Sequence, residues 1–249
     1  MDLGIAGRVA LVLGASQGIG RSVAAELAAE GARVAIASRS LERLRGVAEE
    51  IGATPFAHDN ANLDGVPALI DTVREKLGPV ELLVTNTGGP PANADPLGSS
   101  RDEWEGAYRT LVLAPLSLIA AVMPEMRAGG FGRVVNVASF SVREPIPNLM
   151  LSNSHRAATL AAFKTIARDV AGDGVTLNSV LPGRIGTERI FSLAGGREQA
   201  EENARSEIPI GRLGTPEEIA AAVAFLCSMR AGYITGTALL ADGGLTHLV

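Results

Sequence analysis

Ser152 and Arg156 form the first pair of side chains whose types and spacing could do chemistry. They stand four positions apart in the segment SNSHRA, within a long apolar pattern that has helical spacing. Residues four apart share one helix face, so the hydroxyl and the guanidinium can act on the same bound group. The guanidinium has five N–H donors, which could bind sugar hydroxyls or stabilise an alkoxide.

Proton transfer is harder to obtain from this pair. An aliphatic hydroxyl is a far weaker acid than a phenol, whose reference pKa is about 10, and one cation shifts a pKa by only about 1–3 units. His155 is another candidate, because a reference pKa of about 6.5 suits acid–base catalysis. The same imidazole could instead pack on the flank of the helix.

A glycine-rich turn, GASQGIG at 14–20, is the strongest local signal in the chain. The turn follows a predicted strand and opens a predicted helix, as in dinucleotide-binding βαβ units. Its backbone N–H groups can approach a phosphate, which the helix N-terminus also attracts. The candidate cofactor-binding residues in this turn are Gly14, Ser16, Gln17, Gly18, Ile19 and Gly20.

The end of the second predicted strand bears on the ribose of the cofactor. An acidic residue there would bind the 2′-hydroxyl of NAD, but this chain has Ser38 followed by Arg39. A guanidinium can pair with a 2′-phosphate, which a carboxylate would repel. The sequence therefore favours NADP over NAD, although Arg39 could also be a solvated surface charge.

Seven apolar, β-branched runs alternate with helical patterns along the chain. The runs predict strands at 8–14, 33–38, 53–58, 80–86, 132–139, 175–181 and 238–244. The patterns between them predict helices at 18–30, 40–51, 63–77, 102–128, 150–172 and 215–228. This alternation predicts an α/β fold in one domain over 1–249, a Rossmann-type doubly wound parallel sheet with helices on both faces.

Two loops border the expected ligand crevice. The irregular segment 184–211 is long enough to be a substrate lid, although a mobile insertion would have the same pattern. GGPPAN at 88–93 follows the fourth predicted strand, and its two prolines stiffen the loop. That loop could narrow the substrate pocket or could be only a rigid turn.

Composition argues against several other classes of protein. The net charge is −5 and Lys and Arg do not cluster, which argues against nucleic acid as a partner. The single cysteine, Cys227, excludes an internal disulfide, and the three scattered histidines show no metal spacing. Without a visible signal peptide or an apolar run near about 18 residues, we expect a cytoplasmic protein with no membrane partner.

Together, these motifs make the whole chain resemble the short-chain dehydrogenase/reductase family, most closely the bacterial 3-oxoacyl-acyl-carrier-protein reductases. GASQGIG matches the family's cofactor turn, and TNTGG at 85–89 stands in for its Asn-Asn-Ala-Gly segment. LPGRIGT at 181–187 keeps the Pro-Gly-x-Ile-x-Thr turn that holds the nicotinamide in the family. The resemblance implies further cofactor contacts at Asp59, Asn86, Gly88, Arg156, Pro182, Gly183, Ile185 and Thr187.

The chain departs from the family at the active site that the resemblance implies. The family's usual tetrad is Asn-Ser-Tyr-Lys, in which Tyr is the general acid/base. Ser139 keeps the serine position, and the other three positions hold Leu111, Ser152 and Arg156. Ser139 and Ser152 could jointly polarise a carbonyl oxygen while water delivers the proton. Tyr108, near Leu111, is a further proton-donor candidate or an interface aromatic.

Three functions remain open from the sequence. The first is an NADP(H)-dependent oxidoreductase that acts on a 3-oxoacyl thioester or another small carbonyl compound, with catalytic candidates Ser139, Ser152, His155 and Arg156. The second is a catalytically inactive member that binds dinucleotide and acts as a sensor or subunit partner. The third is a structural partner that has also lost the cofactor, against which the complete cofactor motifs argue.

Two predicted helical segments, 111–123 and 157–167, are apolar nearly all round. A helix on one face of a sheet needs only one apolar stripe, so the remaining apolar surface predicts a second partner. The family pairs these helices between subunits, and the tail LTHLV at 245–249 could add another contact. We therefore expect a homodimer or, as the family commonly forms, a homotetramer.

Overall fold

The structure is a computed structural model and describes residues 2–247. Seven parallel strands form one sheet in the order β3-β2-β1-β4-β5-β6-β7, which confirms the predicted fold class. The strands are β1 (Val9–Leu13), β2 (Arg33–Ser38), β3 (Thr54–Ala57), β4 (Leu82–Thr85), β5 (Gly132–Val137), β6 (Val175–Pro182) and β7 (Ala238–Ala241). The strand order reverses between β1 and β4, where open sheets of this kind bind ligands.

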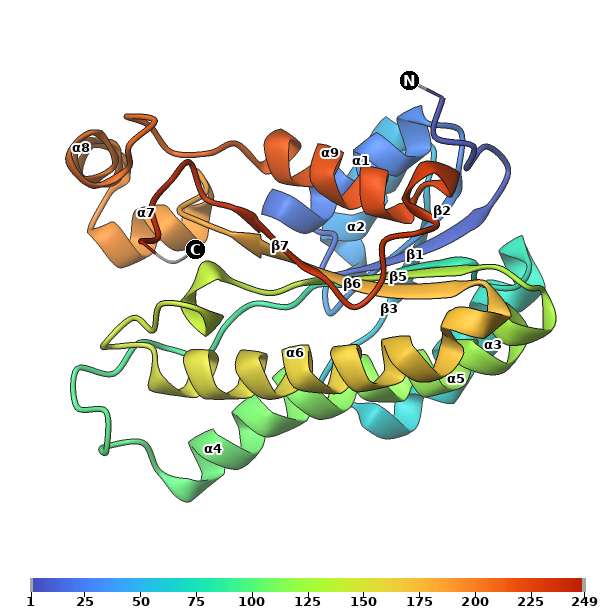
Figure 1. Ribbon diagram of the computed structural model, residues 1–249, viewed down its shortest axis with the longest axis horizontal. Coiled ribbons are helices and arrows are strands. Elements are labelled where there is room, and N and C mark those ends of the chain that lie inside the picture. Colours follow the sequence, from blue (N-terminus) through green and yellow to red (C-terminus); the bar gives the residue numbers. More distant parts are fainter. Residues whose placement is uncertain (1, 248–249) are drawn as a thin grey trace.

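Helices cover both faces of the sheet (Figure 1). One layer contains α1 (Gly18–Ala29), α2 (Leu41–Ile51) and α9 (Pro216–Cys227). The other contains α3 (Val66–Leu77), α4 (Arg101–Tyr108), α5 (Ala114–Ala128) and α6 (Met150–Val170). A separate hydrophobic core fills the space between the sheet and each layer.

Strand β1 shows why the predicted strands are apolar throughout rather than alternating. Ala10 and Val12 belong to the core under α1 and α9. Val9, Leu11 and Leu13 point the other way and belong to the core on the α3–α5 side. Because successive side chains point to opposite faces, a strand covered on both sides needs apolar residues at every position.

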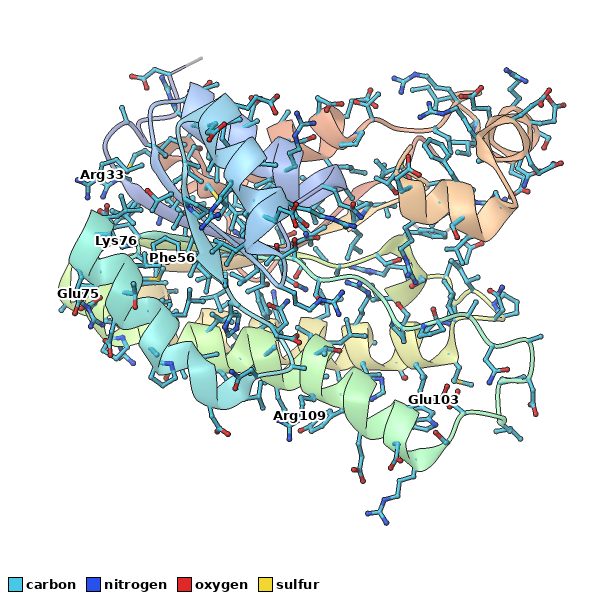
Figure 2. The ribbon with its side chains drawn as sticks, turned by 180° about the vertical axis from the view of Figure 1, so that it is seen from behind. Arg33, Phe56, Glu75, Lys76, Glu103 and Arg109 are labelled. Carbon is cyan, nitrogen blue, oxygen red and sulfur yellow. The ribbon has the colours of Figure 1, made fainter. Side chains whose placement is uncertain are left out.

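Polar contacts fix the ends of several elements. At the start of α4, the Ser100 hydroxyl accepts from the Glu103 N–H at 3.3 Å, and the Glu103 carboxylate accepts from the Ser100 N–H at 2.7 Å (Figure 2). These two bonds form a capping box, which satisfies N–H groups at the helix start. At the end of α3, the Lys76 ammonium lies 5.2 Å from the centre of the Phe56 ring of β3.

The helix predicted at 102–128 is interrupted by a wider turn. Between α4 and α5, Arg109–Leu113 form a π-helical segment. There the Leu111 carbonyl accepts a 2.6 Å hydrogen bond from the Thr159 hydroxyl of α6. Apolar periodicity did not reveal this segment, because its apolar residues Leu111, Val112 and Leu113 continue without a break into the apolar start of α5. Such π turns frequently occur at functional sites.

The segment 184–211 is more ordered than the sequence predicted. It contains α7 (Glu188–Ala194) and α8 (Arg197–Glu207), joined by Gly195 and Gly196 with φ of +83° and +144°. Only Ala200 and Ala204 of α8 are buried, so the helix lacks the apolar stripe from which a sequence pattern is recognised. Both helices follow the carboxyl end of β6 and lie at one end of the molecule (Figure 1).

The helical stretch Arg101–Ala128 is long and apolar enough to cross a membrane by length and composition alone. The expectation that no segment approaches that length was therefore wrong. Half of the apolar window is buried inside the fold, and Leu118, Val122 and Met126 belong to the core beside α3. This packing accounts for the apolar composition within the fold.

Candidate active site

The glycine-rich turn between β1 and α1 forms a backbone cradle with no room for side chains. Gly14 and Gly18 have φ of +63° and +56°, which favours glycine. A Cβ atom on Gly20 would lie 2.3 Å from the Gly14 carbonyl oxygen. At the start of α1, Gln17 makes no side-chain cap and the first turn has no acidic residue. The N–H groups of this turn therefore suit an anion such as a pyrophosphate.

Two more of the predicted cofactor residues lie against this cradle. The Asn86 amide, just after β4, donates to the carbonyls of Leu13 at 3.3 Å and Gly14 at 3.2 Å. The methyl group of Thr187 lies 3.4 Å from where a Gly18 Cβ atom would be. The ends of β1, β4 and β6 therefore meet around the turn, as a dinucleotide site requires.

The residues expected near the adenosine ribose lie at the same edge of the sheet. Ser38 pairs in register with Ala57, so the segments that follow β2 and β3 are neighbours. Arg39 is exposed and has no ion pair with any residue in 2–247. Asp59 accepts a hydrogen bond from the Ala61 N–H at 2.9 Å. Arg39 is therefore free to pair with a phosphate.

The turn after β6 is held by close packing. A Cβ atom on Gly183 would lie 2.6 Å from the Asp242 Cα atom, so the two backbones are in contact. Ile185 forms an isolated parallel bridge with Gly214. Pro182 is the last residue of β6. These contacts fix the loop that leads to Thr187 and α7.

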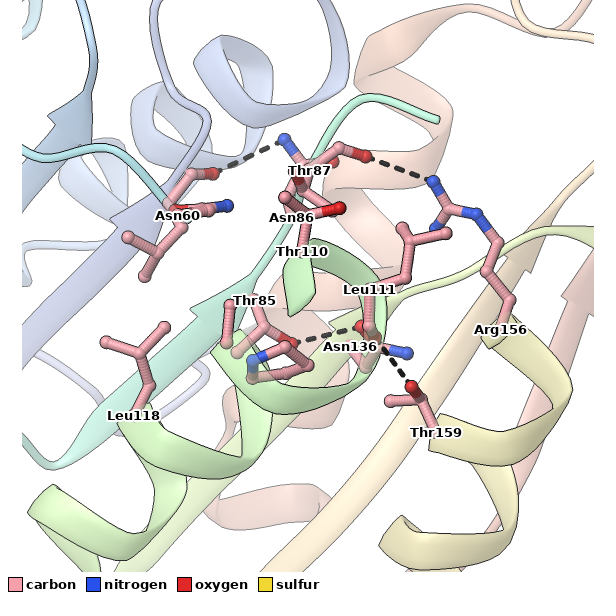
Figure 3. A pocket seen from close by; sticks show the side chains of 13 residues that line it. Asn60, Thr85, Asn86, Thr87, Thr110, Leu111, Leu118, Asn136, Arg156 and Thr159 are labelled. Carbon is pink, nitrogen blue, oxygen red and sulfur yellow. Dashed lines mark hydrogen bonds between the residues drawn. The ribbon is translucent and has the colours of Figure 1, made fainter. Parts of the chain in front are cut away.

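Arg156 is buried and joins three segments of the site. Its Nε–H donates to Ser152 Oγ at 3.2 Å, one turn earlier on α6. Its Nη1 donates to the carbonyls of Val137 at 3.1 Å and Ala138 at 3.2 Å. Its Nη2 donates to the Thr87 carbonyl at 3.0 Å (Figure 3). The side chain therefore links α6 to the ends of β4 and β5.

The charge of Arg156 has no carboxylate partner. Within residues 2–247, no Asp or Glu forms an ion pair with its guanidinium. Burial, and secondarily the charge of Arg189, lower the pKa of Arg156 to about 10. The group therefore remains protonated at neutral pH and places a positive charge beneath the crevice.

Ser152 and Ser139 both have hydroxyl protons available for a ligand. Ser152 Oγ accepts from Arg156, and Ser139 Oγ accepts from the Ser141 N–H at 3.1 Å. Neither hydroxyl donates to an acceptor in the described part of the chain. Ser139 directly follows Ala138, whose carbonyl binds Arg156. Hydrogen bonds thus make a connected site in which Arg156 joins Ser152 to Ala138, the residue before Ser139.

His155 is not part of this connected site. Its Nδ1 lies 2.7 Å from the Leu151 carbonyl oxygen, and its ring centre is 5.2 Å from that of Trp104. The Tyr108 ring centre is 6.1 Å away. These contacts hold the imidazole against α4, and no hydrogen bond among the described residues joins it to either serine.

A small pocket of about 10 Å³, roughly the room for one water molecule, adjoins Arg156 at the point where the strand order reverses (Figure 3). The Thr85 hydroxyl donates to the Asn136 side-chain oxygen at 3.0 Å on its floor. The lining residues are Leu13, Asn60, Thr85, Asn86, Thr87, Thr110, Leu111, Ala114, Pro115, Leu118, Asn136, Arg156 and Thr159. The π-helical turn forms one side, so Leu111 reaches this pocket without carrying a polar side chain.

Two features of the site were missed from the sequence. The Thr87 carbonyl binds Arg156, but a backbone contact has no residue-type signature. Arg189, in the first turn of α7, donates to the Pro90 carbonyl at 2.9 Å. A cation two residues after Thr187 was the available signal for this contact, which joins the segment 184–211 to the loop 88–93.

Comparisons with known proteins agree with this geometry. A family model described as enoyl-(acyl carrier protein) reductase matches residues 14–246. Acetoacetyl-CoA reductase of Rhizobium meliloti is 33% identical over 240 residues, which cover 95% of this chain and 98% of the relative. The 3-oxoacyl-[acyl-carrier-protein] reductase FabG of Vibrio cholerae is 34% identical over 247 residues, covering 98% and 99% of the two chains.

Solved structures show the same similarity. L-Sorbose reductase of Gluconobacter frateurii, in complex with NADPH and L-sorbose, superposes with a TM-score of 0.94. The two chains are 32% identical, and the match covers 100% of each. The similarity therefore extends through the cradle, the pocket and the segment that contains α7 and α8.

Proposed function

The chain belongs to the short-chain dehydrogenase/reductase family, and we propose that it is an NADP(H)-dependent oxidoreductase that reduces a small carbonyl compound. One observation carries the proposal: Arg156 donates to Ser152 Oγ, which leaves the hydroxyl proton for a substrate oxygen. Ser139, at the end of β5, supplies a second hydroxyl of the same kind. These two donors and the buried cation can stabilise negative charge on a carbonyl oxygen.

The residues of this chain stabilise the charge that forms on the carbonyl oxygen. NADPH, when bound, supplies the hydride that reduces the carbonyl carbon. Ser139 and Ser152 donate hydrogen bonds to the oxygen as it becomes negative, and Arg156 adds a positive charge behind Ser152. Preorganised donors of this kind act through electrostatics rather than acidity. Water delivers the proton that completes the alcohol.

The cradle residues support NADP(H) as the cofactor. Gly14, Gly18 and Gly20 fit a pyrophosphate, because any Cβ atom on Gly20 would fill the turn. Arg39 favours a 2′-phosphate over the free hydroxyl of NAD. The sorbose reductase that superposes on this chain was solved with NADPH. Ser38, Asp59, Gly88 and Ile185 complete the proposed contact set.

Cofactor binding and turnover test the proposal directly. NADPH fluorescence should change on titration with the protein, with tighter binding of NADPH than of NADH. NADPH oxidation should then appear with at least one member of a panel of 3-oxoacyl thioesters and small ketones. Binding without turnover across the panel would contradict the enzymatic function.

A second candidate function is a dinucleotide-binding protein without catalysis. It is favoured by Ser152, Arg156 and Leu111, which replace the family's tyrosine, lysine and asparagine. If the double variant Ser152→Tyr with Arg156→Lys gained an activity that the natural chain lacks, this second function would be supported.

We also propose that the chain forms a homodimer or homotetramer. On α6, Ala157, Ala158 and Ala161 are exposed, so part of an apolar helix face is uncovered. Leu239 and Leu240 of the edge strand β7 are each 38% exposed. The predicted contact of the tail 245–249 lies partly outside the described residues, because Leu248 and Val249 are not among them. Size-exclusion chromatography showing only a 25.7 kDa species would contradict an oligomer.

A further inference from the structure

Arg189 projects from α7 toward the loop that follows β4. Its Nη2 donates to the Pro90 carbonyl at 2.9 Å. The same nitrogen lies 2.9 Å from where a Gly89 Cβ atom would be, and Ser152 Oγ lies 3.7 Å from that point. The guanidinium of Arg189 and the hydroxyl of Ser152 therefore both lie on the side of Gly89 to which a Cβ atom would point.

The two cations of the site differ in how far their donors are used. Arg156 directs Nε, Nη1 and Nη2 to protein oxygens. Arg189 uses only Nη2, toward a single carbonyl. In residues 2–247, neither guanidinium has an ion pair with a carboxylate. Arg189 therefore retains N–H donors and an unbalanced charge at the mouth of the site.

The position of Arg189 distinguishes it from the cofactor contacts. Thr187, two residues earlier, lies against Gly18 of the cradle. Arg189 instead lies against Gly89 and Pro90, on the side of Ser152. A phosphate in the cradle would face Thr187, so the free donors of Arg189 are left for the substrate.

We propose that Arg189 is a specificity-determining residue that binds a carboxylate of the substrate, so that the enzyme reduces oxo acids. This inference rests on the proposed oxidoreductase function and names the substrate class of the same site. A guanidinium binds a carboxylate through two parallel hydrogen bonds, which also fixes the orientation of the acid. Because Ser152 binds the carbonyl oxygen, the carboxylate must stand close to the carbonyl, as in 2-oxo and 3-oxo acids.

Electrostatics also favours an anionic substrate. Arg189 and Arg156 repel each other, and the charge of Arg189 is one cause of the lowered pKa of Arg156. A carboxylate bound to Arg189, beside the carbonyl held by Ser152, offsets this repulsion. A neutral ester of the same acid would leave both cations unbalanced.

Binding measured without turnover tests the inference. Isothermal titration of the NADP⁺-loaded protein with a series of short 2-oxo and 3-oxo acids, and with their methyl esters, gives the acid-to-ester affinity ratio. We expect at least one acid to bind about 10- to 100-fold more tightly than its ester. Arg189→Gln should bring the acid-to-ester affinity ratio close to one. Arg189→Lys keeps the charge but loses the two parallel N–H donors, so its ratio should lie between those of the natural protein and Arg189→Gln.

Arg205→Gln provides the matched control. Arg205 lies on α8, is exposed and pairs with Glu202 at 2.8 Å, so its loss should leave the ratio unchanged. Equal binding of acids and esters, no binding of any acid, or an unchanged ratio in Arg189→Gln would each overturn the inference. Reduction of neutral ketones without any preference for acids would overturn this inference alone. Acid binding that depends on Arg189 without NADPH oxidation would overturn the proposed function and the reduction of oxo acids, and would leave only the contact between Arg189 and a carboxylate.

Discussion

The Nε–H of Arg156 donates to Ser152 Oγ at 3.2 Å, across one turn of α6. This bond occupies one lone pair of the serine oxygen, so its proton stays available to donate to another group. Ser152 and Arg156 together present one hydroxyl donor and one cation. The proposed reduction therefore depends on polarisation of the carbonyl by hydroxyl groups rather than on a tyrosine acid.

Removing the Ser152 hydroxyl should reduce catalysis without reducing cofactor affinity. We expect Ser152→Ala to lower kcat/KM by about 10²- to 10³-fold, the usual cost of one oxyanion donor. NADPH affinity, measured by fluorescence, should stay within a few-fold of the natural protein. Ser154→Ala is the control, because its hydroxyl donates within α6 to the Met150 carbonyl at 2.8 Å. Equal kcat/KM values for Ser152→Ala and Ser154→Ala would show that the Ser152 hydroxyl takes no part in catalysis.

Replacing Arg156 should weaken the fold as well as the site. Arg156→Met leaves the carbonyls of Thr87, Val137 and Ala138 without their donor. Unpaired buried acceptors cost about 1–3 kcal/mol each, so the free energy of unfolding in urea should fall by about 2 kcal/mol or more. Arg156→Lys should recover part of this loss, because an ammonium cannot reach all four acceptors. Unchanged stability in both variants would show that these bonds do not hold the strand ends together.

A methyl group at Gly20 should abolish cofactor binding. Its Cβ atom would lie 2.3 Å from the Gly14 carbonyl oxygen, so Gly20→Ala must distort the turn. Gly46→Ala is the matched control, because nothing lies within 4 Å of its Cβ position in α2. There alanine should stabilise the helix by about 0.5–1 kcal/mol and leave NADPH binding intact. Normal NADPH affinity in Gly20→Ala would exclude the turn as the cradle.

Glu218 should make the start of α9 sensitive to acid, because its partners are Arg212 and the Thr215 N–H. Hydrogen bonds from Arg212 and from the Thr215 N–H hold the pKa of Glu218 at about 2. This folded value is below the ordinary value of about 4.3, so the stabilisation is present above pH 4.3 and is lost as pH falls toward 2. The melting temperature of Glu218→Gln should therefore lie below that of the natural protein at pH 7, and the difference should shrink below pH 4.

The control for this pH dependence is Glu49→Gln on α2. Glu49 is exposed and forms no ion pair within residues 2–247. Its melting temperature should follow that of the natural protein at every pH. A difference for Glu218→Gln that stays constant from pH 7 to pH 3 would contradict the assignment of a lowered pKa.

The fold could be predicted well from the sequence because its signals are local. The apolar runs of β1 and β6 and the glycine turn at 14–20 are each recognisable within a short window. The π-helical segment Arg109–Leu113 could not be predicted, because the apolar run that begins at Leu111 continues through it into α5. Helix α8 could not be predicted either, because only Ala200 and Ala204 are buried and the helix has no apolar stripe.

The candidate site was predictable in part. The spacing of Ser152 and Arg156 on one helix predicted that both could act on one group, and the structure shows them bonded. The surroundings of His155 depended on where Trp104 lies, which only the packing of α4 against α6 decides. Arg189 was missed because its contact with Pro90 joins residues 99 positions apart. Contacts between distant loops have no periodic signature in a sequence.

Deuterium transfer tests the central claim most directly. NADPH that carries deuterium at the transferable C4 position should be incubated with the natural protein and a panel of oxo acids and ketones, and the products analysed by mass spectrometry. If the proposed reduction occurs, the product is an alcohol with one deuterium at the former carbonyl carbon. The Ser152→Ala variant should form this alcohol far more slowly. Bound NADPH that transfers no deuterium to any member of the panel would contradict the proposed reduction and would support a dinucleotide-binding protein without catalysis.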